Sequence, residues 1–381
     1  MSDFIDPTPN TLVDAVLFIS FLDLSASALH QLLRRFYAEP YKIKHPPEAM
    51  LRLFALQKLR GHRFLSELDR ELDDRAIKLL GFKYKPSYKT VWHWLNKRVG
   101  PEGLEALHTE LMKLIDHALA ARGIQMAKTV AGDATPIEAK SQDREAAYCG
   151  YYKMRCYLVH HFICAKTGLT LNWIVAPSNV DEGQFMLPLL AKTVTDGFKP
   201  ERLVLDNGYG HYFNYEIPNL LGIKLMIGFR RKKNKFSWRG KPRTLKLRFR
   251  KMIKAGKLTL ERLSELGMQV NPEKNSLEDV VCGLAIAGQH EYAGAYYRNR
   301  SLAWFKRDRK GWMSVYAPPR SFIEGTHGHQ KDWLGLDDFV EKGLRKARLH
   351  VALCMLCEAA VACVRVQNGY AEALTSCAYI R

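Results

Sequence analysis

Apolar residues in the first part of the chain recur three and four positions apart, which is the spacing of amphipathic helices. Residues 48–59 show this pattern most clearly, and Gly61 ends it. The same spacing predicts further helices over residues 64–72, 74–80, 87–98 and 104–121. We therefore expect an all-helical N-terminal domain over residues 1–125.

One of these helices, residues 87–98, has Ser87 as its expected N-cap and basic side chains on its outer face. Because two shorter helices precede it, it has the position of the helix that enters the major groove in helix-turn-helix proteins. In that interpretation Lys89, His93 and Lys97 contact DNA. A plain helical bundle with a solvated basic face has the same pattern, so the sequence leaves both interpretations open.

After residue 125, short apolar or alternating runs replace the helical pattern, and such runs indicate strands. Strands are expected over residues 128–133, 154–165, 170–176, 202–206 and 224–229. Helices are expected between them over residues 183–194 and 214–221. This order predicts an α/β core, residues 126–229 and 317–381, in which helices cover a mixed sheet.

Residues 230–316 are expected to be an insertion into this core. Its first part, residues 230–257, is rich in Lys and Arg and contains no acid. It opens on Arg230, Arg231, Lys232 and Lys233. A basic run of this length, interleaved with aromatic residues such as Trp238, favours contact with a nucleic-acid backbone. The later half has strand-like alternation, so we expect the insertion to be mostly β there.

A helix-start pattern follows at Ser321, because Glu324 lies three residues later and two prolines come just before. The helical pattern continues to about residue 366, with Gly343 as a weak point. Glu324 and Lys331 are nearly two turns apart and should share one face. Arg320 would lie at the positive end of the helix dipole. Taken alone, Glu324 also fits the ordinary role of a helix-capping acid.

Composition narrows the class of partner. The 381 residues carry a formal net charge of +19, which attracts a polyanion, usually nucleic acid. Ribosomal and membrane-surface proteins share this property. Eight scattered cysteines indicate a reducing compartment, and no secretory signal is visible. The apolar run at residues 351–364 is typical of a buried helix. His350, Cys354 and Cys357 share one face of it, but without a fourth ligand we favour a packed helix over a zinc site.

Two acids upstream change the interpretation of Glu324. Asp133 and Asp206 each end an apolar run and lie beside a glycine. Functional groups gather where the strands of α/β sheets end, so three carboxylates converge if these two strands are neighbours. Their mutual repulsion implies a divalent cation, and oxygen ligands select Mg²⁺ or Mn²⁺. Two such ions suit phosphodiester chemistry. Taken singly, each Asp fits a turn residue equally well.

Three motifs together resemble the DDE transposases of prokaryotic insertion sequences, in the large group related to insertion sequences four and five. The matching segments are Gly-Asp-Ala-Thr-Pro-Ile-Glu-Ala at residues 132–139, Leu-Val-Leu-Asp-Asn-Gly-Tyr at residues 203–209, and the set Tyr316, Arg320, Glu324 and Lys331. The intervals from Arg320 to Glu324 and from Glu324 to Lys331 are those of the family. The interval from Tyr316 to Arg320 is one residue longer.

This resemblance implies an RNase H-like catalytic core with two Mg²⁺ or Mn²⁺ ions held by Asp133, Asp206 and Glu324. It also implies that Arg320, Lys331 and Tyr316 hold DNA phosphates, although the interval between Tyr316 and Arg320 departs from the family. An aromatic residue of the insertion would stabilise a distorted or flipped terminal base. The candidates are Trp238, Trp304 and Trp312.

The function expected from the resemblance is a transposase that binds terminal inverted repeats, cleaves double-stranded DNA at them and joins the ends to target DNA. It would act as a homodimer on DNA, in the prokaryotic cytoplasm and associated with the nucleoid. Two alternatives share most of these features: a DNA nuclease of the same fold without strand transfer, and a domesticated DNA-binding protein. A tyrosine recombinase is disfavoured, because no Arg…His-x-x-Arg…Tyr set is evident.

Overall fold

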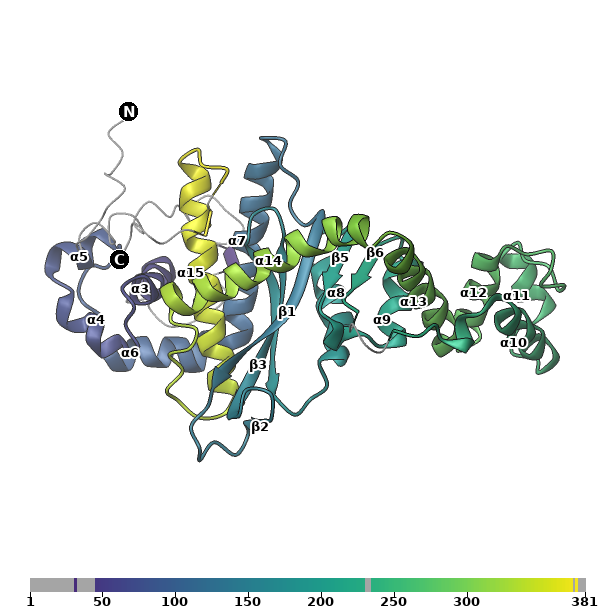
Figure 1. The fold of residues 1–381 in the computed structure, drawn as a ribbon. Coiled ribbons are helices and arrows are strands. Elements are labelled where there is room, and N and C mark those ends of the chain that lie inside the picture. The colour runs from purple at the N-terminus through teal and green to yellow at the C-terminus, as the bar shows by residue number, and fades with distance from the viewer. Residues whose placement is uncertain (1–30, 33–44, 230–233, 373, 376–381) are drawn as a thin grey trace.

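The protein is elongated and built around one mixed sheet (Figure 1). The computed structural model describes residues 31–32, 45–229, 234–372 and 374–375. The strands are β1 (Thr129–Glu138), β2 (Ala147–Cys149), β3 (Met154–Cys164), β4 (Thr170–Pro177), β5 (Arg202–Leu205) and β6 (Lys224–Ile227). Their order is β2-β3-β1-β5-β6, with β4 also paired to β3. β1 is antiparallel to β3 and parallel to β5, so the predicted mixed sheet is confirmed.

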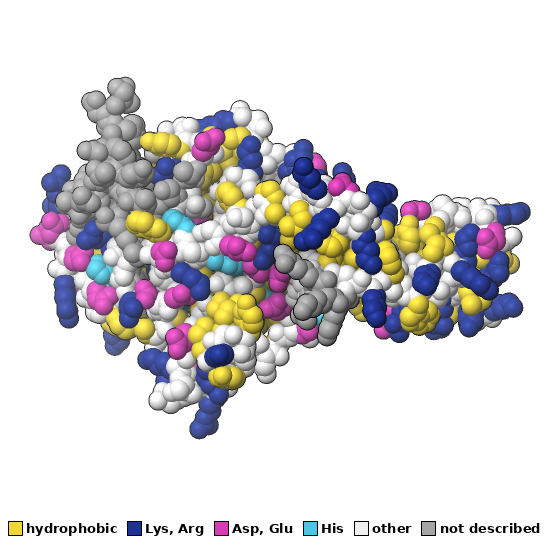
Figure 2. All heavy atoms as spheres, in the orientation of Figure 1, with side chains coloured by type: hydrophobic (Ala, Val, Ile, Leu, Met, Phe, Trp, Pro, Cys, Tyr) yellow, Lys and Arg dark blue, Asp and Glu magenta, His cyan; other side chains and the backbone are white. Residues whose placement is uncertain are grey.

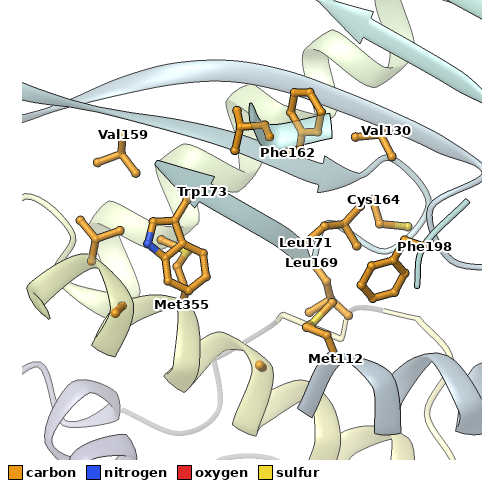
Figure 3. Close-up of a cluster of buried hydrophobic side chains, with 14 of the residues drawn as sticks. Met112, Val130, Val159, Phe162, Cys164, Leu169, Leu171, Trp173, Phe198 and Met355 are labelled. Atoms are coloured by element: carbon orange, nitrogen blue, oxygen red, sulfur yellow. The ribbon is translucent and has the colours of Figure 1, made fainter. Parts of the chain in front are cut away.

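Helices cover both faces of this sheet, as predicted for an α/β core. Two of them, α7 (Gly100–Ala120) and α15 (Leu344–Gln367), pack on one face. Figure 3 shows the core on that side, where Met355 of α15 lies near Trp173 of β4 and Met112 of α7 lies near Leu169. The opposite face meets α14 (Arg309–Leu334). Because successive side chains of a strand alternate in direction, Val130 belongs to the first core and Ala131 to a cluster with Ile323 of α14.

Within the described residues, α15 is the one helix long and apolar enough to cross a membrane, but 89% of its most apolar window is buried inside the protein. The three residues weighed as zinc ligands have other contacts there. The thiols of Cys354 and Cys357 donate to the carbonyls of Leu334 and Ala55. His350 lies 3.0 Å from a carbonyl oxygen through Nε2. α15 is therefore a core helix of this fold.

The N-terminal region is helical wherever the structure describes it in regular elements. Its elements are α3 (Pro47–Leu59), α4 (Leu65–Glu71), α5 (Asp74–Leu79), α6 (Tyr88–His93), the π-helical turn Trp94–Val99, and α7. Ser87 caps α6 as predicted, since its Oγ accepts a hydrogen bond from the Thr90 N–H at 3.3 Å. Buried residues from Ala49 of α3 to Leu374 belong to one continuous core. The N-terminal helices thus pack as part of the molecule's main core.

Two predicted helices lie between the strands of the sheet. They are α8 (Met186–Thr195), which follows the 3-10 turn η2 (Glu182–Gln184), and α9 (Tyr212–Leu220), which follows the 3-10 turn η3 (Asn207–Tyr209). Both agree with the sequence prediction to within a few residues. The two short turns matter more for function, because both lie at the edge of the site described below.

The insertion was expected to be mostly β in its later half, and this is wrong. Its described elements are all helical: η4 (Trp238–Gly240), α10 (Pro242–Lys254), α11 (Leu260–Glu265), α12 (Leu277–Ile286) and α13 (His290–Arg307). The aromatic residues that suggested strands include the helical pair Tyr292 and Tyr296. Gly294 lies so close to the Tyr212 backbone that a Cβ would collide with it, so α13 packs tightly on α9. This packing outweighs the strand propensity of the aromatics.

Three of these helices, α10, α11 and α12, form a separate lobe at the narrow end of the molecule (Figure 1). On α10 the buried residues are Leu245, Phe249 and Met252. They are four and three residues apart, so they lie on one face of the helix. The edge of Phe249 meets Gly283 of α12 so closely that a Cβ there would collide with the ring. The buried side chains of the lobe are continuous with the main core of the molecule, and its basic side chains are mostly exposed.

The helix that carries Glu324 begins twelve residues before the predicted start. α14 starts at Arg309, with the Asp308 carboxylate accepting from the Gly311 N–H at 2.8 Å. It continues through Pro318 and Pro319 and ends at Leu334, where Gly335 adopts the left-handed conformation (φ 64°). A helix break at residues 335–343 replaces the continuous helix expected to residue 366. The capping interpretation of Glu324 is wrong, and so is the placement of Arg320 at the helix entrance.

Packing explains why the helix passes through two prolines. Trp312 of α14 is buried with Val204 of β5 and Met226 of β6, and Tyr316 packs beside it. This contact fixes the first turns of α14 on the sheet before the prolines are reached. The two missing N–H groups cost hydrogen bonds to the preceding turn, and the burial of two large aromatic rings offsets that loss.

Candidate active site

The polar side chains of α14 form one stripe over the sheet. Tyr316, Arg320, Glu324, His327 and Lys331 follow one another at intervals of four, four, three and four residues, so all project from the same side of the helix. All five line a single cleft of about 1350 Å³. The longer interval between Tyr316 and Arg320 is itself helical, and it keeps Tyr316 on the stripe.

The two aspartates enter the same cleft from the sheet. β1 and β5 are parallel neighbours in which Gly132 is paired with Leu205, so the residues that follow them, Asp133 and Asp206, lie side by side. Asp206 comes directly after the end of β5, as predicted. Asp133 does not end its strand, because β1 continues to Glu138 in pairing with β3. The prediction that the two acids converge is confirmed, although one of them lies within a strand.

The glycines near the two aspartates, Gly132 and Gly208, allow close packing within the protein. A Cβ at residue 132 would collide with Leu205 and with the Phe162 ring, so this glycine permits close packing within the core. A Cβ at residue 208 would collide with the carboxylate of Glu182. Only Gly208 therefore makes room for a functional side chain, and that side chain belongs to the protein.

Arg320 joins the helix to the sheet at the centre of the cleft. Its Nη2 donates to Asp133 Oδ2 at 2.8 Å, and its Nη1 donates to the Gly132 carbonyl at 3.1 Å. Burial raises the pKa of Asp133 above its usual value, although the Arg320 charge opposes this. The side chains of Arg320 and Asp133 are only 13% and 19% exposed, so this ion pair is shielded from solvent.

Glu182 is a further acid in the cleft that the sequence analysis did not single out. Burial raises the pKa of its carboxyl, and the negative charges of Asp133 and Asp206 raise it further. Its only local signal is the pair Asp181-Glu182 just before the helix predicted at residue 183. That signal is typical of any helix start, so the acid becomes visible only when the chain is folded.

His327 of the α14 stripe packs on a second histidine, His161, which lies on the sheet beneath it. His161 is fully buried on β3 directly opposite Asp133, and its ring contacts that of His327 at a centroid distance of 5.0 Å. Burial lowers the pKa of His327 to about 3, and the charges of Lys331 and Arg320 add to this effect. His327 is therefore neutral at neutral pH. It adds no positive charge to the cleft.

The cleft is acidic in a strongly basic protein. Among the described residues that line it, five are Asp or Glu and three are Lys or Arg, whereas the whole chain has a net charge of +19. Figure 2 shows Asp and Glu side chains over the middle and the wide end of this face, while many Lys and Arg side chains lie on the lobe. A cleft meant only for DNA phosphates would gain nothing from an excess of acid. The excess favours a cation.

The donor groups fit a hard divalent ion. The carboxylates of Glu182, Asp206 and Glu324 make no hydrogen bond or ion pair with any described residue. Glu324 is exposed, whereas Glu182 and Asp206 are partly buried, and partial burial makes an unpaired charge costly. All are oxygen donors, which Mg²⁺ and Mn²⁺ prefer. In the described part of the chain no three acids, histidines or cysteines are gathered closely enough to hold one ion as they stand. Asp133 is turned toward Arg320 instead.

Comparison with known families decides the class. Residues 125–357 match the family model of the transposase DDE domain, which is more than half of the chain. The protein is a DDE transposase. Its match spans the sheet, the lobe and α14, and includes every acid of the cleft. No solved structure and no curated protein sequence is a significant match to the chain.

Two further candidate residues of the transposase, Tyr316 and Lys331, lie on α14. Tyr316 donates from its hydroxyl to the Leu205 carbonyl at 3.3 Å and stacks on Trp312. Lys331 pairs with Asp337 in the loop after α14, at 3.2 Å. Both line the cleft, so the structure brings together all the acids and the Tyr-Arg-Glu-Lys set. Their roles in binding DNA stay a prediction.

Of the other predicted DNA contacts that the structure describes, Trp312 is the one that lines the cleft. Lys89, His93 and Lys97 are exposed in the N-terminal helices. Trp238 is 55% exposed with the Arg239 guanidinium over its ring, whereas Trp312 is buried within the α14 contact. Trp304 packs beside that contact and is half-buried. Arg230, Arg231, Lys232 and Lys233 lie outside the described residues.

Proposed function

We propose that this transposase binds the terminal inverted repeats of its own insertion sequence, cleaves the DNA at those ends and joins the 3′-hydroxyl to target DNA. The observation that carries the proposal is the acidic cleft itself, in which Asp133, Asp206 and Glu324 meet beside Arg320. The three motifs that line it support membership of the group related to insertion sequences four and five. The proposed setting is the nucleoid of a prokaryotic cell.

In this proposal Asp133, Asp206 and Glu324 hold Mg²⁺ or Mn²⁺, in two sites. When bound, such ions supply activation of a water or 3′-hydroxyl and stabilisation of the leaving oxygen. The protein's own contribution is to fix the carboxylates by the pairing of β1 with β5 and by the packing of α14. Arg320 donates to one oxygen of Asp133, Oδ2, so the other oxygen can bind an ion while the guanidinium stays beside the site, where it can also contact a phosphate.

Basic residues of the chain hold the DNA against this site. Lys331 and Tyr316 are proposed to contact phosphates near the cleaved bond, where both already line the cleft. Exposed Lys and Arg of the lobe, and Lys89, His93 and Lys97 of the N-terminal helices, are proposed to bind the DNA farther from the cut. Two copies on paired ends would allow both ends to be cut together, so the proposed active form is a homodimer on DNA.

A reaction with a labelled duplex carrying the end of the element, supercoiled plasmid and Mg²⁺ tests the proposal. The expected product is labelled DNA covalently joined to the plasmid, and Asp206→Asn should form none. Ends that are cut but never joined would instead identify a nuclease without strand transfer. Binding without any metal-dependent cut would identify a DNA-binding protein that has lost the activity.

A further inference from the structure

Glu182 is held in place by a set of contacts that its neighbours provide. The Asp181 carboxylate accepts from the Gly183 N–H at 2.8 Å and pairs with His211 at 2.9 Å. The side chain of Asn214, which is buried, donates to the carbonyls of Gly183 and Tyr209, both at 2.8 Å. Asn214 thereby ties the turn containing Glu182 to the turn that follows Asp206.

The ordinary role of an acid at this position would be to cap α8 or the turn before it. In the turn that role is already taken, because Asp181 accepts the hydrogen bond from the turn's backbone, and α8 begins after Phe185 without a side-chain cap. Glu182 makes no hydrogen bond or ion pair within the described part of the chain. Its carboxylate lies against Gly208, two residues after Asp206, where any larger residue would displace it. Local structure therefore gives no reason for a carboxylate here.

The surroundings of Glu182 make its charge costly without a cation. It is partly buried, and Asp133 and Asp206 both act on it with the same sign of charge. Arg320, the cation at the centre of the cleft, is engaged by Asp133. The same cleft is lined by His327, which is more than nine-tenths buried and whose Nε2 has no partner among the described residues. Two unsatisfied groups of different chemistry thus face one space, and both are suited to an ion or its bound water.

We propose that Glu182 is a fourth carboxylate of the divalent-cation site, acting beside Asp206 in addition to the three acids of the motif. The inference rests on the proposed function, because it assigns one more ligand to the same site. This assignment explains both the buried Asn214 and the glycine at residue 208. Asn214 fixes the two turns relative to each other, and Gly208 leaves the space in which the carboxylate lies.

The test is the binding of Mn²⁺ alone to the full-length protein, measured by the loss of the electron paramagnetic resonance signal of free Mn²⁺. Glu182→Gln keeps the shape of the side chain and removes its charge. Glu138→Gln is the matched control, since Glu138 is an exposed carboxylate on the same strand as Asp133 and does not line the cleft. Asp206→Asn reports on the proposed site as a whole. Thermal unfolding without Mn²⁺ is recorded for each protein.

We expect Glu182→Gln to weaken Mn²⁺ binding at least about tenfold, because even the loss of groups that only support a metal ligand costs about that much. Without Mn²⁺ this variant should unfold at the wild-type temperature or higher, since it removes one of several like charges. Glu138→Gln should bind as the wild type does. If Glu182 had only a structural role, Glu182→Gln would unfold at a lower temperature than the wild type without metal. That result would overturn the assignment.

The remaining outcomes separate the two proposals. If Asp206→Asn loses Mn²⁺ binding and Glu182→Gln binds like the wild type, the metal site stands and Glu182 is no part of it. If the wild type binds no Mn²⁺, or Asp206→Asn binds as well as the wild type, the proposed metal site fails and the role of Glu182 fails with it.

Discussion

The cleft and the lobe differ in structure, and the proposed roles differ with them: metal binding in the cleft and DNA binding by the lobe. In the cleft, Asp133 and Asp206 are fixed by neighbouring parallel strands, and Glu324 by a helix of 26 residues packed across them. In the lobe, basic side chains project from α10, whose buried face consists of Leu245, Phe249 and Met252. Metal chemistry depends on the relative positions of a few oxygens, whereas attraction to a phosphate backbone depends mainly on the number of charges.

The largest expected effect separates chemistry from binding. Asp133→Asn, Asp206→Asn and Glu324→Gln should each reduce Mg²⁺-dependent cleavage by at least about a thousandfold, because each removes a charge on which the ion depends. The affinity for DNA, measured by fluorescence anisotropy of a labelled end, should stay within a few-fold of the wild type. Cleavage that survives in one of the three would remove that residue from the site.

How far the sequence predicts this site depends on how local each signal is. Asp206 follows an apolar run that ends where β5 ends, so the pattern places it correctly. The rest of β1 contains Thr135 and Pro136 and resembles a loop. It stays in the sheet because, beyond Gly132, β1 pairs with β3 alone, and proline is tolerated in a strand paired on one side. The sequence therefore predicts correctly that Asp133 lies beside Asp206, but places it at a strand end that does not exist.

Structural features that depend on tertiary contacts could not be predicted from the sequence. Ser321 and Glu324 satisfy the local rule for a helix start, yet Trp312 and Tyr316 start the helix earlier by packing on β5 and β6. Aromatic residues between 292 and 312 suggested strands, but they cover α9 and the sheet as helices. Glu182 reaches the cleft through a turn held by Asn214, a contact that joins residues 31 positions apart. Such contacts exist only once the chain has folded.

A smaller effect is expected from the lobe. The set to be changed to glutamine is exposed, forms no ion pair with a described residue, and consists of Arg243, Lys251, Lys254 and Lys257. If all four contact phosphates, the slope of log affinity against log salt should become less steep by about 3 to 4, because each contact contributes about 0.9. The rate of cleavage at saturating protein should change little. Fluorescence anisotropy over a range of salt concentrations measures the slope.

A charge-matched control tests whether the position of those charges matters. Four exposed lysines lie at the opposite end of the sheet from Asp133 and Asp206, near the start of β1, β5 and β6: Lys128, Lys166, Lys199 and Lys224. Their conversion to glutamine removes the same total charge. We expect the salt dependence of the control to stay near that of the wild type. Equal slopes for the two quadruple variants would assign the basic run of the lobe to solvent.

The smallest effect concerns the junction at which the lobe is joined to the core, between α9 and α13. There the fully buried Glu216 contacts His290, with Nδ1 lying 2.9 Å from Oε1. Burial raises the pKa of Glu216, and the hydrogen bond to His290 opposes this. His290→Ala leaves the buried carboxylate without this partner and should lower the free energy of unfolding in urea by about 1–3 kcal/mol at pH 7.5. Adding Glu216→Gln should restore part of the loss.

The pH dependence of stability tests whether the buried charge of Glu216 causes this loss. It is compared between His290→Ala and the double variant His290→Ala with Glu216→Gln. A carboxyl whose folded pKa is raised contributes its full stability below its unfolded pKa and loses it as the pH rises through the folded pKa. Because His290 is absent from both, the difference between His290→Ala and His290→Ala with Glu216→Gln isolates Glu216. The single variant should be the less stable of the two at pH 7.5, and the gap should close near pH 4, where Glu216 is protonated in both states. A gap that does not change with pH would mean that the lobe is joined to the core by packing alone, with no contribution from this buried charge.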